Sequence, residues 1–280
     1  MMHKIALIGF GNWGKILLPH LRKRFDIVHV YGRSIEPKGI FTNCLDKALD
    51  SRAEAVVIAT SINTHFDIVR EALLRNKHIF CEKPLTTVPQ QTKELIAIAD
   101  SKKLQLVTDY TYTFSKRLLE VQAGLVAGNI GRLHTVLMTL RRDIRDREAG
   151  VYWILASHLM AILGMFIDLS RLKFEKKEYA LGQCAHVLFK GEIEGALFVD
   201  MAAVNKKTEV ILHFDEGRLE FVDLVQDDNL GYALEYFDEV LDGKVNNEAN
   251  LAISSSVADV LWELQGKRIR HDIKGIENVI

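Results

Sequence analysis

The segment KIALIGFGNWG, residues 4–14, joins an apolar run to three glycines spaced as G-x-G-x-x-G. The run over residues 4–10 is typical of a strand that is buried on both faces, and a helical pattern follows over residues 13–24. A strand, this glycine pattern and a helix, in that order, form the unit that binds the pyrophosphate of a dinucleotide. The segment therefore predicts the first β-α unit of a Rossmann domain.

Each glycine has its own role in such a unit. Gly9 allows the tight turn, Gly11 lets the backbone approach the pyrophosphate, and Gly14 lets the helix lie close to the strand. The anion would meet the free N–H groups at the helix N-terminus. The residues expected to bind cofactor here are Gly9, Phe10, Gly11, Asn12, Trp13 and Gly14. The alternative is a glycine-rich turn that binds no ligand.

Strands and helices continue to alternate up to residue 109. Further short apolar strands are expected over residues 26–32, 54–60, 77–82 and 104–109, with helices over 64–76 and 89–102. This alternation predicts a parallel sheet that helices cover on both faces, which is the doubly wound α/β architecture. We assign residues 1–110 to a dinucleotide-binding Rossmann domain.

The pattern changes after residue 110. A helix is expected over residues 115–127, and a final helix at about 247–265. The strand-like runs of this part are residues 132–143, 178–189, 193–204, 207–214 and 218–223. The last four follow one another across polar turns without helices, which indicates an antiparallel sheet. We therefore expect residues 111–280 to form an α+β domain with an open, mainly antiparallel sheet.

The composition indicates a globular protein, with 48% hydrophobic and 26% charged residues among 280. A formal net charge of −1 gives no field that would attract nucleic acid or an anionic membrane, so neither partner is expected. Three widely spaced cysteines, and an N-terminus without the features of a secretory signal, favour the reducing cytoplasm. The ten histidines lack paired ligand spacing, so we expect no metal site.

Residues 151–167 carry no formal charge apart from the titratable His158. Seventeen residues are at the lower end of the length that spans a bilayer, and Ser157 and His158 lie near the middle. A buried helix is therefore expected here rather than a membrane span.

The residues after the second strand bear on the choice of cofactor. An acid there would bind the ribose 2′-hydroxyl of NAD, but the sequence has Gly32-Arg33-Ser34 instead. The guanidinium of Arg33 and the hydroxyl of Ser34 suit a 2′-phosphate. NADP(H) is the predicted cofactor. NAD(H) is the alternative, if Arg33 only stacks on the adenine.

The segment ATSINTHFDIVREALLRNKHIFCEKPLTT, residues 59–87, resembles, together with the glycine motif, the Gfo/Idh/MocA family of nicotinamide-dependent oxidoreductases. Its EKP signature is Glu82-Lys83-Pro84, and residues 107–114, 128–136 and 266–273 are also similar to the family. The segment VYWILASHLMAIL, residues 151–163, resembles the W-D-L-x-x-H segment of members that act on nucleotide-linked sugars. The resemblance implies both domains, and a second sheet that commonly builds a homo-oligomer.

Lys83 is the first catalytic candidate. It lies at the carboxyl end of a parallel strand, where open α/β sheets bind their ligands, and an amine there can exchange a proton with a substrate hydroxyl. The resemblance implies a catalytic Lys83, cofactor contacts from Thr60, Glu82 and Lys83, and a cis Lys83–Pro84 bond. The alternative for Lys83 is a surface lysine beside a turn.

His158 is the second catalytic candidate, because it matches the histidine that serves the family as acid or base. Family members often carry carboxylates four residues before and three residues after it, on one helix face. Here those positions are Ile154 and Ala161. An apolar face favours the neutral imidazole, which can still accept a proton. The alternative is a histidine that belongs to the core.

Four residues are candidates for substrate contact. Tyr110 and Tyr112 follow the fifth strand, where they either point into the cleft or pack between the domains. Arg141 and Arg145 lie in the mixed-charge run RRDIRDRE, residues 141–148, which either holds a substrate phosphate or carboxylate or forms a solvated loop.

Together with the resemblance, these observations predict an NADP(H)-dependent oxidoreductase that acts at a hydroxyl or carbonyl carbon of a sugar or sugar-like substrate, nucleotide-linked sugars included. Two alternatives remain open. One is a cofactor-binding regulator that has lost catalysis, as Ile154 and Ala161 suggest. The other is a reductase of a non-sugar carbonyl or imine that uses Lys83 and a tyrosine.

Overall fold

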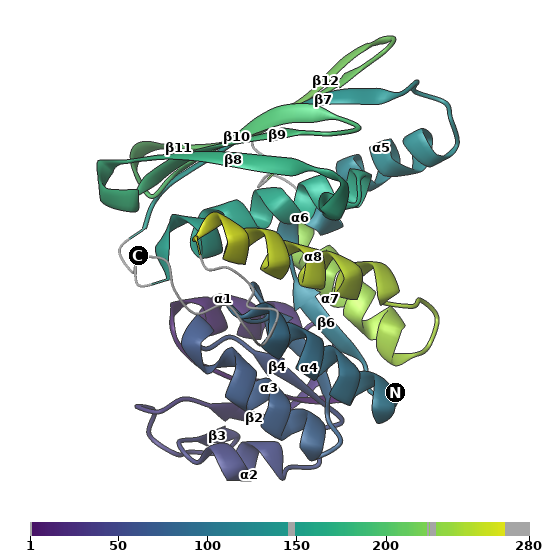
Figure 1. Ribbon diagram of the computed structural model, residues 1–280. Coiled ribbons are helices and arrows are strands. Elements are labelled where there is room, and N and C mark those ends of the chain that lie inside the picture. Colours follow the sequence, from purple (N-terminus) through teal and green to yellow (C-terminus); the bar gives the residue numbers. More distant parts are fainter. Residues whose placement is uncertain (1, 145–148, 223, 225–227, 267–280) are drawn as a thin grey trace, which may run out of the picture.

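Two sheets organise the chain, one above the other in Figure 1. The computed structural model describes residues 2–144, 149–222, 224 and 228–266. Within these ranges each sheet has six strands, in the orders β3-β2-β1-β4-β5-β6 and β12-β11-β7-β10-β9-β8. The first sheet is parallel throughout, and its order is the one typical of doubly wound dinucleotide-binding folds.

The first sheet contains the predicted strands. Their bounds are β1 Lys4–Ile8, β2 Asp26–Tyr31, β4 Ala55–Ile58, β5 His78–Glu82 and β6 Leu106–Asp109, with the short edge strand β3 Phe41–Thr42 in addition. The helices between them are α1 Asn12–Leu21, α2 Leu45–Leu49, α3 His65–Leu74 and α4 Pro89–Ser101. Strand β3 and helix α2 were not predicted, because two and five residues are too few to show a period.

The second sheet is mainly antiparallel, as predicted, with β7 and β10 as its parallel pair among the described strands. The elements are α5 Lys116–Val126, β7 Leu133–Asp143, α6 Ser157–Phe166, β8 Lys173–Tyr179, β9 Cys184–Lys190, β10 Glu194–Asp200, β11 Ala202–Phe214 and β12 Gly217–Val222. The single strand expected over 178–189 is wrong. Ala180, Leu181 and Gly182 have positive φ and turn the chain between β8 and β9, and only the glycine signals such a turn in the sequence.

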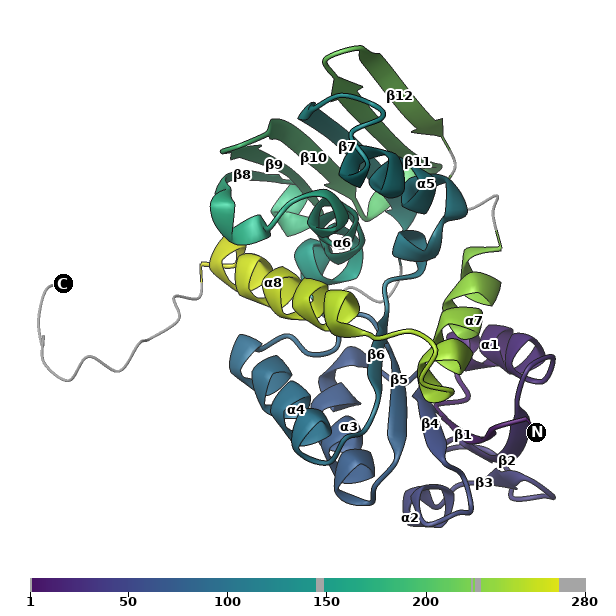
Figure 2. The same cartoon turned by 90° about the vertical axis from the view of Figure 1, so that its right-hand side faces the viewer.

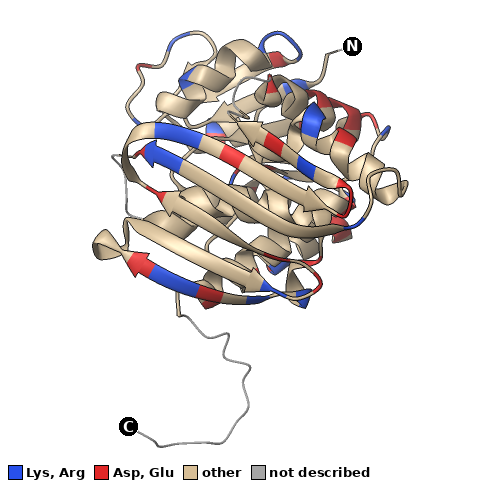
Figure 3. Cartoon of the chain, turned by 90° about the horizontal axis from the view of Figure 1, so that it is seen from above, with Lys and Arg blue, Asp and Glu red and all other residues tan. Residues whose placement is uncertain are grey.

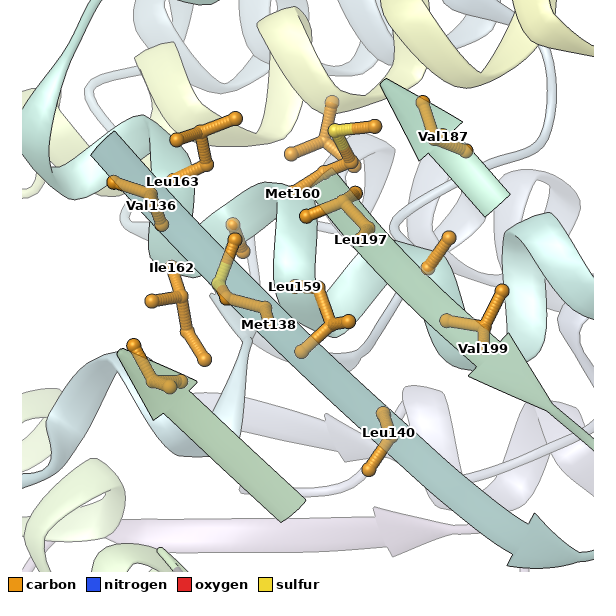
Figure 4. Packing of buried hydrophobic residues seen from close by; sticks show 14 of the residues in the cluster. Val136, Met138, Leu140, Leu159, Met160, Ile162, Leu163, Val187, Leu197 and Val199 are labelled. Atoms are coloured by element: carbon orange, nitrogen blue, oxygen red, sulfur yellow. The ribbon is translucent and has the colours of Figure 1, made fainter. Parts of the chain in front are cut away.

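Residues 151–167 form the buried helical segment that was expected. A π-helical turn, Tyr152–Ala156, leads into α6. Figure 4 shows Leu159, Met160, Ile162 and Leu163 of α6 against side chains of β7, β9 and β10. Across the described part of the chain, no helix combines the length and the apolar character needed to cross a bilayer.

The C-terminal part of the chain returns to the first sheet. Helix α7, Asn229–Leu241, packs beside α1 on one face of that sheet, while α2, α3 and α4 cover the other. The Phe237 ring lies 6.1 Å from Phe25 and 5.2 Å from Phe80 between centroids. Helix α7 was not predicted, although Leu230, Leu234 and Phe237 have helical spacing.

Helix α8, Glu248–Leu264, contacts both halves of the molecule, as Figure 2 shows. It packs against α6 under the second sheet and against α4 and β6 of the first. The Asn250 side chain accepts from the backbone N–H of Thr108 at 2.8 Å and donates to its carbonyl at 2.9 Å. The carboxyl end of β6 is therefore held by a residue that lies 142 positions later in the chain.

Candidate active site

The glycine turn has the geometry of a dinucleotide-binding loop. Gly9 has φ +106°, and a Cβ there would lie 2.5 Å from the Ala59 carbonyl oxygen. A Cβ on Gly14 would lie 1.9 Å from the Gly9 carbonyl oxygen, whereas a Cβ on Gly11 would meet nothing within 4 Å. Gly9 and Gly14 are thus required by backbone packing, and Gly11 leaves open space in front of the α1 N-terminus for a phosphate.

The neighbouring residues of the predicted cofactor site lie along the same edge of the sheet. Phe10 is partly buried and packs against Gly32, while Asn12 begins α1 and is exposed. Arg33 and Ser34 follow β2 and are exposed, so both can reach a ligand at this edge. The Thr60 hydroxyl accepts a hydrogen bond from Thr64 at 2.8 Å in the turn after β4.

A cavity of about 510 Å³ lies where the two domains meet. The elements around it are α1, the ends of β5 and β6, the end of β7, α6 and the start of α7. The lining residues are Trp13, His20, Glu82, Lys83, Thr111, Tyr112, Arg142, His158, Asp228, Asn229 and Leu230. Both catalytic candidates, Lys83 and His158, therefore face one space that begins at the glycine loop.

Lys83 is held from both domains. The peptide bond to Pro84 is cis, which confirms the expectation from the EKP signature. The Lys83 Nζ donates a hydrogen bond of 2.7 Å to the backbone carbonyl of Ile154. Ile154 lies in the π-helical turn, where the Ser157 hydroxyl also donates to a carbonyl, that of Trp153, at 2.7 Å. π-Helical turns occur frequently at functional sites, and here one presents a carbonyl to the lysine.

Two carboxyl groups lie beside Lys83. Glu82 and Asp109 are register partners at the ends of β5 and β6, and Glu82 also accepts a hydrogen bond from the Trp13 indole. Burial raises the pKa of Asp109 to about 6, and burial together with the Asp109 charge raises the pKa of Glu82 well above its usual range. The side chains of Glu82 and Thr111 both form hydrogen bonds with Asp109. Because the pKa of Glu82 is the more strongly raised, the two acids retain one proton between them at neutral pH.

Burial lowers the pKa of Lys83 to about 8, against the opposing effect of the Glu82 and Asp109 charges. An amine with this pKa exchanges its proton near neutral pH, which an ordinary lysine does not.

His158 is the neutral partner in the site. Burial, and then the charges of Lys83 and Arg142, lower the pKa of His158 well below its usual value. Its Nδ1 has no hydrogen-bond partner among the described residues, and its ring lies 4.9 Å from that of Tyr112. The imidazole is therefore uncharged at neutral pH and able to accept a proton.

The four substrate candidates are divided by the structure. Tyr112 lines the cavity. Tyr110 is 1% exposed, packs in the hydrophobic core under the second sheet and forms a hydrogen bond with Ser254. Arg141 is not among the lining residues, and its Nε lies 3.5 Å from an Asp200 oxygen. Arg145 lies outside the described residues. The lining arginine is Arg142, which directly follows Arg141 in the sequence.

Several residues of the site were not predicted from the sequence. His65 is 1% exposed. Its ring nitrogens lie 2.9 Å from the Pro84 carbonyl oxygen and 3.1 Å from the Thr60 carbonyl oxygen, so it connects the turn after β4 to the turn after β5. Asp109 ends the fifth predicted strand, as Glu82 ends the fourth. The carboxyl ends of parallel strands meet at one edge of the sheet, so the sequence could have predicted that these two acids lie together. Asp228 and Asn229 reach the cavity through α7, which was not predicted.

The comparisons with known proteins agree with this geometry. Residues 3–110 match the model of the Gfo/Idh/MocA oxidoreductase family, which has an NAD-binding Rossmann fold. The oxidoreductase YhhX of Escherichia coli is 30% identical over 146 residues, 48% of this chain and 42% of that protein. The myo-inositol 2-dehydrogenase of Thermotoga maritima is 24% identical over 178 residues, 62% of this chain and 50% of that protein. The chain thus spans half or less of the length of these two relatives.

The fold of the whole described chain also has known counterparts. The UDP-N-acetylglucosamine 3-dehydrogenase GnnA of Acidithiobacillus ferrooxidans superposes with a TM-score of 0.84 at 14% identity, over 95% of this chain and 98% of that one. At this identity the likeness shows the fold alone. The predicted fold class, a Rossmann fold followed by a mainly antiparallel sheet, is confirmed, and so is the family resemblance, which the match covers over residues 3–110.

The pKa of Lys83 predicts how turnover depends on pH. Oxidation of an alcohol needs a neutral amine to accept the proton, so its kcat should rise as the pH increases through about 8. Reduction of a carbonyl needs the ammonium form, so its kcat should fall over the same interval. Steady-state rates in both directions across this range check the signs. Lys83→Arg should remove the inflection, and a wild-type profile without an inflection near 8 would contradict the assignment.

Proposed function

We propose, from the membership of residues 3–110 in the Gfo/Idh/MocA oxidoreductase family, that the protein is an NADP(H)-dependent oxidoreductase of sugar-like substrates. The observation that carries the proposal is the meeting of Lys83 and His158 in one cavity that continues to the glycine loop. The relatives support the class of substrate, since the Thermotoga maritima protein is named a myo-inositol dehydrogenase and GnnA a dehydrogenase of a UDP-sugar.

The bound nicotinamide supplies or accepts the hydride, and residues of this chain manage the proton. In the oxidative direction the substrate hydroxyl loses its proton to the neutral Lys83 amine or to the neutral His158 imidazole as the C–H hydride departs. In the reductive direction the ammonium of Lys83 returns a proton to the new alkoxide. The Ile154 carbonyl orients Lys83, and Glu82 with Asp109 keeps one negative charge beside it.

The regulatory alternative rested on the absence of carboxylates at positions 154 and 161. The Lys83 amine is oriented by the backbone carbonyl of Ile154, which is present whatever side chain position 154 carries. The positioning of Lys83 therefore does not depend on those carboxylates, which supports an active enzyme over a catalytically impaired binding protein. His158 has no carboxylate on its own helical segment, residues 151–167, to orient it.

The preference for NADP(H) rests on Arg33 and Ser34, which are exposed at the end of β2. Arg33→Ala should weaken NADPH binding by about 10- to 100-fold, because charge-assisted hydrogen bonds to a phosphate are lost, and should change NADH binding much less. Titrations followed by nicotinamide fluorescence measure both affinities. Tighter binding of NADH than of NADPH by the wild-type protein would assign the cofactor as NAD(H).

Substitution of the two catalytic candidates tests the reaction. Lys83→Ala and His158→Ala should each retain NADPH binding, because the glycine loop and Arg33 are unchanged, and should each lower turnover by about 10²–10⁴-fold. The assay is oxidation or reduction across a panel of inositols, sugars and keto-sugars. Normal turnover by His158→Ala together with inactive Lys83→Ala would make the histidine a packing residue. NADPH binding without turnover of any panel member would instead support the regulator.

We also propose a homo-oligomer built through the outer face of the second sheet. Figure 3 looks onto this sheet, whose central part carries few charged residues. Leu137 and Leu188 are 39% and 54% exposed, and Ala196 of β10 is the register partner of both. A continuous apolar strip of this kind favours association with another apolar surface. Light scattering should give the mass of a dimer or larger assembly, Leu188→Lys should lower it, and a monomeric wild type would refute the proposal.

A further inference from the structure

Arg142 is a partly buried cation in the wall of the active-site cavity. Its Nη1 donates to the backbone carbonyls of Arg141 at 2.7 Å and Lys207 at 3.0 Å. Its Nη2 donates to the Tyr112 hydroxyl at 3.1 Å and to the Thr208 hydroxyl. All four acceptors are neutral, and no carboxylate of the described residues forms an ion pair with Arg142. Within the described ranges the guanidinium is therefore fixed in place without a counter-ion.

None of the described charges around the cavity is paired with Arg142. The lining carboxylate Asp228 is exposed and caps α7, where it accepts from the backbone N–H of Gly231 at 3.0 Å. Lys83 is a second cation, and His158 is neutral partly because of these two charges. The Glu82 and Asp109 carboxyl groups share a proton and lie beside Lys83. By contrast, the preceding arginine, Arg141, has Asp200 as a partner outside the cavity. A partly desolvated charge is costly without an opposite charge, and an anionic ligand would supply one at Arg142.

Tyr112 connects Arg142 to the catalytic groups and supplies a donor. Its hydroxyl oxygen accepts from Arg142, so its own hydrogen is available for an acceptor in the cavity. Its ring lies 4.9 Å from that of His158. Both residues line one cavity, so a group bound at this tyrosine hydroxyl would lie in the same space as His158. This arrangement suits an anion carried by the sugar unit that reacts.

We propose that Arg142 and Tyr112 bind a carboxylate of the substrate, which makes the substrate a sugar acid of the uronic or aldonic kind. Arg142 supplies the positive charge and Tyr112 the O–H donor. This assignment rests on the proposed function, because it places the carboxylate beside the carbon that reacts.

Matched acids and amides isolate the contribution of charge. Isothermal titration of the NADPH-loaded and NADP⁺-loaded protein would compare D-glucuronate with D-glucuronamide and D-gluconate with D-gluconamide. At least one acid should bind about 10- to 100-fold more tightly than its amide, since charge-assisted hydrogen bonds contribute this much. Arg142→Gln should abolish the discrimination and Tyr112→Phe should reduce it. Arg132→Gln, a change of the same charge at a side chain that is 79% exposed, should retain it.

Tyr112→Phe keeps the test decisive if Arg142→Gln does not fold, because it removes only the hydroxyl. Equal affinities for acid and amide, no saturable binding of either acid, or full discrimination in both variants would overturn the carboxylate assignment. Tighter binding of D-glucose 6-phosphate than of both acids would also overturn it and would identify a phosphate as the anion. The same measurements separate this proposal from the proposed function. Turnover of neutral sugars with no preference for acids would contradict only the carboxylate site. Arg142-dependent binding of an acid without turnover of any substrate would contradict only the assignment as an oxidoreductase.

Discussion

The hydrogen bond from Lys83 to the Ile154 carbonyl joins the two domains at the point where the chemistry is expected. Lys83 ends a strand of the first sheet, and Ile154 belongs to the helical segment under the second. A change in the separation of the domains therefore moves the amine relative to the cavity. The acceptor is an uncharged carbonyl, so it orients the amine without adding the negative charge that would raise its pKa. Burial can then lower the pKa of Lys83 to about 8.

The charges in the site are arranged in two groups with separate roles. Glu82 and Asp109 retain one proton between them, so this buried pair of carboxyl groups carries a single negative charge next to Lys83. Arg142 lies on the opposite domain and is held by neutral acceptors. Burial first, and then the positive charges of Lys83 and Arg142, lower the pKa of His158 well below its usual value, which keeps the imidazole neutral.

Sequence reasoning predicted the first domain well because its signals are local. The apolar strands, the glycine spacing and the EKP signature each lie within a few residues, and they predicted the parallel sheet and the cis Lys83–Pro84 bond. The roles of Lys83 and His158 stay predictions that the geometry makes chemically reasonable. Long-range features were harder to predict. Helix α7 was missed, although its apolar residues recur with a helical period, and the core that it completes lies in the first domain, far from it in the sequence.

The choice among neighbouring candidates also needed the structure. Tyr110 and Tyr112 follow the same strand, but a 3-10 turn at Thr111–Phe114 places the first in the core and the second in the cavity. Arg141 and Arg142 differ by one position on β7, and one position reverses the face of a strand to which a side chain points. Without the register of β7 the sequence does not tell which arginine lines the cavity.

The return of α7 to the first sheet has a consequence for the order in which the protein folds during synthesis. The core on one face of the Rossmann sheet includes Phe237, whose ring lies against Phe25 and Phe80. When the ribosome has made the six parallel strands, which end at Asp109, more than half of the 280 residues are still to come, and that face lacks its second helix. The apolar residues beneath α7 stay uncovered until then, and exposed apolar surface of this kind promotes aggregation. Nascent chains of this protein are thus most exposed to aggregation over the interval between β6 and α7.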